Sequence, residues 1–96
     1  MAEQKASQIC IVTVTGADRV GIIAKLATTM AKANVNIVDV NQKILEDCFV
    51  MTMAVDIAQA TLDIGQIKRQ LDHIGKLMAL KITIQYENIF KAMHRV

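Results

Sequence analysis

The sequence contains no proline and no tryptophan, and only three residues are aromatic: Phe49, Tyr86 and Phe90. Because proline is absent, no position forces a kinked helix or a cis X-Pro peptide bond. A sheet surface that binds single-stranded RNA needs several exposed rings for base stacking. Phe49 alternates with Met51 and Met53, as core residues do. The scarcity of aromatic residues therefore argues against that kind of surface.

Long apolar runs and clustered charges are also missing. No stretch provides the ~20 consecutive apolar residues that a membrane-spanning helix needs, and residues 1–8 lack the apolar centre of a secretory signal. The formal net charge is +2 and the basic residues are scattered, which argues against a nucleic-acid partner. We expect a cytoplasmic protein with no membrane partner, a flexible tail over residues 1–8 and one domain over residues 9–96.

Cysteine and histidine are sparse. Cys10 and Cys48 could form a disulfide on count alone, but a chain without an export signal favours reduced thiols. With His73 and His94 they show neither C-x-x-C nor H-x-x-x-H spacing, so we predict no metal site and no cofactor. No histidine lies beside a candidate nucleophile and the acidic residues are dispersed, so we predict no catalytic residues and no enzyme activity.

Four segments have strand character. Residues 9–14 are β-branched and almost continuously apolar, which is typical of a central strand. Residues 36–45 alternate between apolar and polar, which indicates a half-exposed strand at an edge. The polar pair Glu46-Asp47 suits a hairpin turn into a second central strand over residues 48–55. A last strand follows over residues 80–86.

Two segments have helical periodicity. Apolar residues recur every three or four positions over residues 19–33 and again after residue 61. We expect Asp18 to cap the first helix and Asn34 to end it in the left-handed conformation. For the second helix, Thr61 is the expected cap and Asp63 suits the first turn.

The order of these elements is β-α-β-β-α-β, followed by a short helix over residues 88–96. This order predicts a ferredoxin-like two-layer sandwich of α+β class, in which both longer helices cover one face of a four-stranded antiparallel sheet. The last helix carries Ile89, Phe90 and Met93 at helical spacing. Its apolar side must therefore pack on the open sheet face, on an edge strand or on a second subunit.

The stretch from Val14 to Ile22 joins the first strand to the first helix and holds two glycines, one acid and one base. The first N–H groups of a helix have no intrahelical partner, and their dipoles favour negative charge. The turn is therefore a candidate pocket for a small ligand with a carboxylate, whose ammonium group Asp18 could pair. The alternative is that the glycines only form the turn, Asp18 only caps and Arg19 is solvated. On the residues alone this alternative is the simpler one.

Three motifs together resemble a known family: Asp18-Arg19-Val20-Gly21-Ile22 after the first strand, Asn36-Ile37 at the start of the second, and Ile89-Phe90-Lys91-Ala92-Met93. The combination resembles the short stand-alone ACT-domain proteins of bacteria and archaea. It is also similar to the ACT repeats of the glycine cleavage system transcriptional repressor. The chain departs from the family pattern at Val20, where many members have proline.

The resemblance implies a regulatory module that pairs into a homodimer and binds an amino-acid effector at the interface. A regulated enzyme or regulator is then a further partner. The family's ligand contacts would fall on Asp18, Arg19, Val20, Gly21, Ile22, Asn36 and Ile37. The alternative function is a ligand-free protein-interaction or transcription-regulatory subunit, because no segment for catalysis or DNA binding accompanies the module.

Overall fold

The computed structural model describes residues 6–93 and confirms the predicted order of elements. They are β1 (Ile9–Ala17), α1 (Ile22–Lys32), β2 (Asn36–Leu45), β3 (Cys48–Asp56), α2 (Ile64–Met78), β4 (Leu80–Tyr86) and α3 (Glu87–Met93). The strands form one antiparallel sheet in the order β2-β3-β1-β4, so β2 and β4 are its edges. Most of the predicted tail, and His94, lie outside the described residues.

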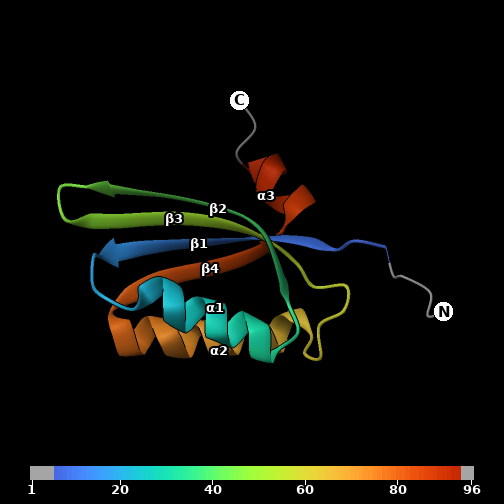
Figure 1. The fold of residues 1–96 in the computed structure, drawn as a ribbon. Helices are drawn as coiled ribbons and strands as arrows, with labels where there is room; N and C mark the ends of the chain where they lie inside the picture. The colour runs from blue at the N-terminus through green and yellow to red at the C-terminus, as the bar shows by residue number, and fades with distance from the viewer. Residues whose placement is uncertain (1–5, 94–96) are drawn as a thin grey trace.

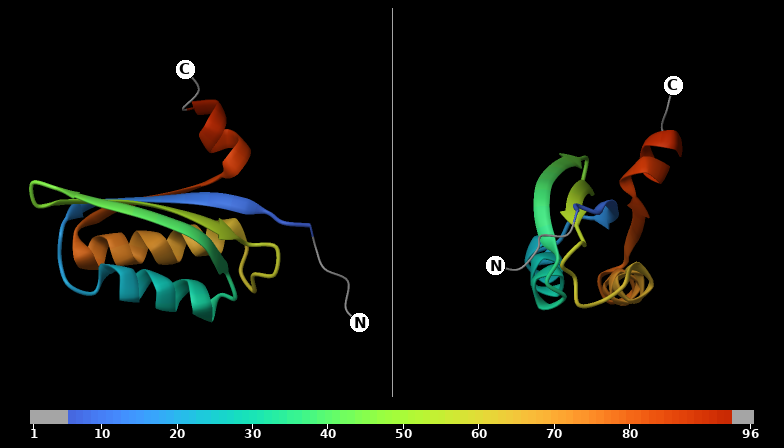
Figure 2. Two further views of the ribbon diagram at one scale, coloured as in Figure 1. Left: turned by 45° about the horizontal axis from the view of Figure 1, so that its top comes forward. Right: turned by 90° about the vertical axis from the view of Figure 1, so that its right-hand side faces the viewer.

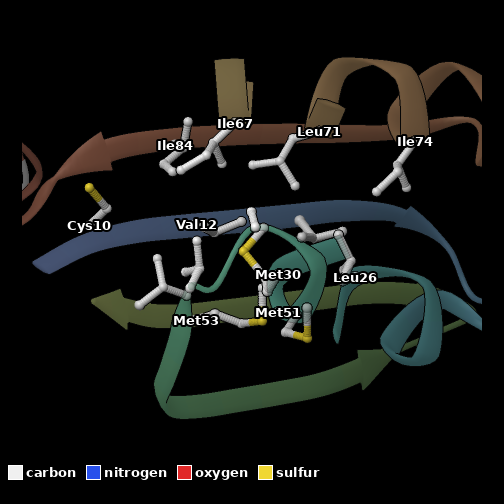
Figure 3. Close-up of a cluster of buried hydrophobic side chains, with 14 of the residues drawn as sticks. Cys10, Val12, Leu26, Met30, Met51, Met53, Ile67, Leu71, Ile74 and Ile84 are labelled. Carbon is white, nitrogen blue, oxygen red and sulfur yellow. The ribbon is translucent and has the colours of Figure 1, made fainter. Parts of the chain in front are cut away.

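The two longer helices lie side by side on one face of the sheet, and α3 lies on the opposite side (Figures 1 and 2). The predicted ferredoxin-like sandwich is thus confirmed. Between sheet and helices, alternate residues of β1 and β3 meet the apolar stripes of α1 and α2 (Figure 3). The most deeply buried large side chains include Met30, Met51, Leu26, Ile67 and Leu71.

The β2–β3 hairpin turns at Glu46-Asp47, as the sequence predicted. Both residues have positive φ, 47° and 68°, which is the conformation of the tight turns that match the twist of paired strands. β2 is the predicted edge strand, since all but one of its residues are exposed. Its register places Ile44 opposite Phe49, so Ile44 lies on the helix-facing side of the sheet.

β1 continues past Val14, where the sequence ended the predicted strand, to Ala17. The additional residues pair with β3, where Ala17 lies opposite Cys48. Gly16 lies in this extension, and a larger residue would not fit there. A Cβ at this position would come within 2.7 Å of the Leu80 side chain and 3.1 Å of the Ala79 carbonyl oxygen. The first strand therefore reaches the corner between α2 and β4.

Two capping predictions are wrong. α1 begins at Ile22 rather than Arg19, and its cap is Gly21, with no side-chain hydrogen bond from Asp18. The Asp18 N–H instead donates to the Asp47 carbonyl at 3.0 Å, which keeps residue 18 with the sheet and leaves a turn before the helix. α2 is capped by Asp63 and not by Thr61, because only Asp63 has Gln66 three residues ahead. Asn34 follows α1 with φ 56°, as expected.

Candidate functional site

The β1–α1 turn, residues 18–21, lies at the end of the sheet where the β2–β3 hairpin closes. The backbone bond between Asp18 and Asp47 joins the turn to the hairpin tip. At the middle of the turn, Val20 is fully exposed. The turn is therefore held at its start by the sheet and presents its remaining residues to solvent.

The N-terminus of α1 is left open. Gly21 has φ 93° and ψ 0°, and its carbonyl accepts from the Lys25 N–H at 2.9 Å, which closes the first helical turn. The N–H groups of the first three helical residues, 22–24, then have no intrahelical acceptor. A Cβ built on Gly21 meets no atom within 4 Å. The space beside Gly21 is therefore open, and the helix dipole favours a negative charge at this terminus.

A pocket of about 390 Å³ lies beside this helix terminus. Residues 18–24 form one side, and Gln42 and Ile44 of β2 with Phe49 of β3 form the other. The first wall holds the charged residues Asp18 and Arg19 beside the apolar residues Ile22 and Ile23. The opposite wall is largely apolar. Such a pocket suits a small ligand that has both charged groups and an apolar part.

The structure brings together five of the seven predicted site residues. Asn36 and Ile37 lie at the opposite end of the layer, because the eleven residues of α1 span roughly 16 Å. Asn36 pairs with Asp56 and borders a separate pocket of about 430 Å³ near the end of α1. Ile37 is half-buried against the core. Within one chain, therefore, neither residue reaches the turn.

Gln42 and Ile44 line the turn pocket but were not among the predicted site residues. Their position follows from the hairpin, because Leu45 pairs with Cys48 across the two-residue turn and alternate residues then share a face. The alternation of β2 and the location of its turn were both visible in the sequence. Counting back from the turn would have placed Ile44 opposite Phe49.

The sequence model of the ACT domain family matches residues 8–85 of this chain. A UPF0237 protein of Pyrobaculum aerophilum is 42% identical over 89 residues, which are 93% of this chain and 99% of that protein. A UPF0237 protein of Listeria innocua is 43% identical over 86 residues, 90% of this chain and 97% of that protein. The chain belongs to the ACT domain family. ACT domains are in general regulatory modules that bind small ligands and dimerise.

Solved structures agree with this assignment. An ACT domain protein from Streptococcus pneumoniae superposes with a TM-score of 0.76 at 30% identity, covering 93% of this chain and all of that chain. A protein described as a glycine cleavage system transcriptional repressor shares the fold with a TM-score of 0.73 at 20% identity. The match covers 85% of this chain and 47% of the repressor. The sequence had predicted a resemblance to stand-alone ACT-domain proteins and to the ACT repeats of this repressor.

Neither thiol of this ACT domain is among the residues that line the turn pocket, and the two thiols lie apart from each other. Cys10 pairs with Val55 and Cys48 with Ala17, at opposite ends of the β1–β3 ladder, so the two sulfurs cannot bond within the chain. Burial, with a smaller contribution from the Asp56 carboxylate, raises the pKa of the Cys10 thiol to about 11. That thiol is therefore protonated at neutral pH and a poor nucleophile.

Residues 6–93 contain no group of three or more His, Cys, Asp or Glu side chains that could hold a metal ion. In the same part of the chain, no helix combines the length and apolar character needed to cross a membrane. Five of the seven residues that the family resemblance implies as ligand contacts line the turn pocket.

Proposed function

We propose that this ACT domain is a non-enzymatic regulatory module of the cytoplasm, which binds a free amino acid at the β1–α1 turn and acts as a homodimer. The observation that carries the proposal is the open N-terminus of α1, where unpaired N–H groups and the space beside Gly21 form one side of a pocket. Amino-acid binding would order the exposed turn and tighten the dimer. A partner enzyme or regulator would then respond to the change.

The pocket provides a group for each part of an amino acid. The α-carboxylate accepts from the N–H groups of α1 and from the Arg19 guanidinium, as anions do at helix N-termini. The ammonium group pairs with the Asp18 carboxylate. The side chain lies along Ile23, Ile44 and Phe49, which are apolar lining residues from both sides of the pocket. The preferred effector is therefore an amino acid with an aliphatic side chain.

A second copy of the chain would supply Asn36 and Ile37. The β2 edge is exposed, and Val38, Ile44 and Leu45 are each more than half exposed along it. When two identical strands pair antiparallel about a two-fold axis, the first residue of one strand lies near the last residue of the other. Asn36 of one copy would then lie close to Leu45 of its neighbour, beside the neighbour's turn pocket. Asn36 could donate to a bound carboxylate from there.

Calorimetry with the common amino acids tests the proposal. At least one aliphatic amino acid should bind the wild-type protein, and Gly21→Val should abolish binding because its side chain would occupy the space beside the helix terminus. Arg19→Gln should weaken binding by about tenfold, as the loss of a charge-assisted hydrogen bond implies. Arg69→Gln makes the same chemical change on α2, outside the pocket, and should leave the affinity unchanged.

Light scattering at micromolar protein tests the dimer. The expected mass is twice the 10.6 kDa of the chain. A monomeric mass with and without the effector would contradict dimer action. If no common amino acid binds, the ligand-free interaction or transcription-regulatory subunit becomes the better proposal. A partner captured independently of metabolites would then support it.

A further inference from the structure

Another pocket lies between α1 and α2, and it shares no lining residue with the turn pocket. Its volume is about 290 Å³, and it is lined by Lys25, Thr29, Arg69, Gln70, His73 and Ile74. We call this pocket the interhelix groove. Lys25 and Thr29 lie one turn apart on α1, and Arg69 and His73 lie one turn apart on α2. α1 and α2 lie side by side (Figures 1 and 2), and polar residues from adjacent turns of both helices line this one pocket.

The helical layer around the groove has an excess of positive charge. α1 and α2 together hold five lysine or arginine residues and one acidic residue, Asp72. The Asp72 carboxylate pairs with Lys68 at 3.1 Å. The Asp63 carboxylate, just before α2, accepts from the Gln66 N–H at 2.8 Å. Both carboxylates are thus paired with groups outside the groove.

Within the described residues, 6–93, the cations of the groove have no carboxylate partner. The ion pairs found within residues 6–93 are Lys68–Asp72 and Lys91–Glu87, and neither includes Lys25 or Arg69. The Thr29 hydroxyl donates to the Lys25 carbonyl at 2.8 Å, so its proton is already used. An anion in the groove would therefore be held by the guanidinium, the ammonium and the His73 and Gln70 N–H groups.

We propose that the interhelix groove binds the phosphate group of a small phosphorylated metabolite. A guanidinium donates two parallel hydrogen bonds to one phosphate edge, and an ammonium adds a point charge that its flexible stem can direct. The buried Ile74 side chain gives the groove an apolar floor for carbon atoms attached to the phosphate. The volume of about 290 Å³ accommodates such a metabolite. Since the groove lies on the solvent side of the helices, binding should be weak and sensitive to salt.

Titration of the ¹⁵N-labelled protein with inorganic phosphate, at constant low ionic strength set with sodium chloride, tests the site. We expect saturable shifts of the amide signals of Lys25, Thr29, Arg69 and His73. Arg69→Gln should weaken phosphate binding by about tenfold or more, because a charged hydrogen-bond donor is lost. Lys76→Gln removes the same charge from α2 outside the groove and should change the affinity less than about twofold.

Two further arms identify the source of the phosphate. Glycerol 3-phosphate should bind more tightly than inorganic phosphate if the groove recognises a soluble metabolite. Vesicles that contain phosphatidic acid should retain the protein no better than phosphatidylcholine vesicles. Retention on the acidic vesicles that Arg69→Gln and Lys76→Gln reduce equally would overturn the proposal, because it would indicate attraction to a charged surface.

Shifts that do not saturate, or an equal weakening of phosphate binding by Arg69→Gln and Lys76→Gln, would also overturn it. The amino-acid site is tested separately, since Gly21→Val should leave phosphate binding unchanged. If amino acids bind and phosphate does not, this proposal fails and the proposed function stands. If phosphate binds and amino acids do not, the reverse holds.

Discussion

The two helices that cover the sheet begin in different ways. At α2, the Asp63 carboxylate accepts from the Gln66 N–H at 2.8 Å, and the Gln66 side chain accepts from the Asp63 N–H at 3.0 Å. At α1, the cap is Gly21 in the left-handed region and no side chain accepts from the first turn. Both helices bury an apolar stripe on the same face of the sheet. Packing against the sheet therefore does not explain why their N-termini are capped differently. α2 satisfies its terminal donors internally, whereas α1 leaves them for solvent or a ligand.

Asp63→Ala should have the largest effect on stability. The substitution removes the acceptor of the Gln66 N–H and the partner side chain of the capping box, so the free energy of unfolding should fall by about 1–2 kcal/mol. Urea denaturation at one fixed protein concentration measures the loss, because a dimer's stability depends on concentration. Asp63→Asn keeps an acceptor and should stay close to wild type. An unchanged midpoint for the alanine variant would contradict the role of the box.

Gly21→Ala should lower the free energy of unfolding by roughly 1 kcal/mol, through the backbone alone. Alanine would have to adopt φ 93°, a left-handed conformation that L-residues with a Cβ disfavour. A clash contributes nothing, since a Cβ there meets no atom within 4 Å. Gly21→Asn should lose less stability, because asparagine tolerates this region better. Equal stability of wild type and the alanine variant would show that α1 can begin without the glycine conformation.

The N-terminal cap of α2 could be predicted from the sequence alone, whereas the cap of α1 could not. Asp63 and Gln66 stand in a local motif, three residues apart, and the cap could have been assigned from that spacing. The Asp18 side chain has a good capping residue type, but its backbone N–H is bonded to Asp47, almost thirty residues away in the chain. Local propensity cannot report such a contact. The α1 start was therefore the less predictable of the two.

The fold itself was predictable because its signals are periodic. Alternation located β2 and β3, and helical spacing located α1 and α2, with errors confined to their ends. The site was only partly predictable. The turn residues are contiguous in sequence, but the opposite wall depends on register, which brings Gln42 and Ile44 to the turn. The remoteness of Asn36 from the turn within one chain likewise follows from the length and direction of α1.

Asp56, the last residue of β3, carries a carboxylate whose hydrogen-bond partners lie outside the helices. Asp56 accepts hydrogen bonds from the Ala58 and Gln8 N–H groups, both at 3.0 Å, and these bonds lower the pKa of its carboxyl. A carboxyl whose pKa is lower in the folded state contributes stability above its unfolded pKa and loses that contribution as pH falls through the folded pKa. The stability of the wild-type protein should therefore decline as pH falls below about 4.

Asp56→Asn should remove this part of the pH dependence, because the amide does not titrate. Urea midpoints measured from neutral to acid pH for both proteins check the prediction, and the difference between them should narrow towards low pH. The effect should be smaller than that of Asp63→Ala, since solvent reaches the Asp56 carboxylate. Parallel pH profiles would contradict a stabilising role for the charged form.

Asp18→Ala should have the smallest effect on stability, within about 0.5 kcal/mol of wild type. The Asp18 carboxylate caps nothing, and the backbone bond from residue 18 to Asp47 survives the substitution. Under the proposed function the same variant should bind the amino-acid effector more weakly, because the ammonium group loses its partner. Urea denaturation beside Asp63→Ala, with calorimetry on the same samples, measures both effects. If Asp18→Ala destabilises the protein as much as Asp63→Ala does, Asp18 caps α1 in solution and the donors assigned to the ligand are already satisfied.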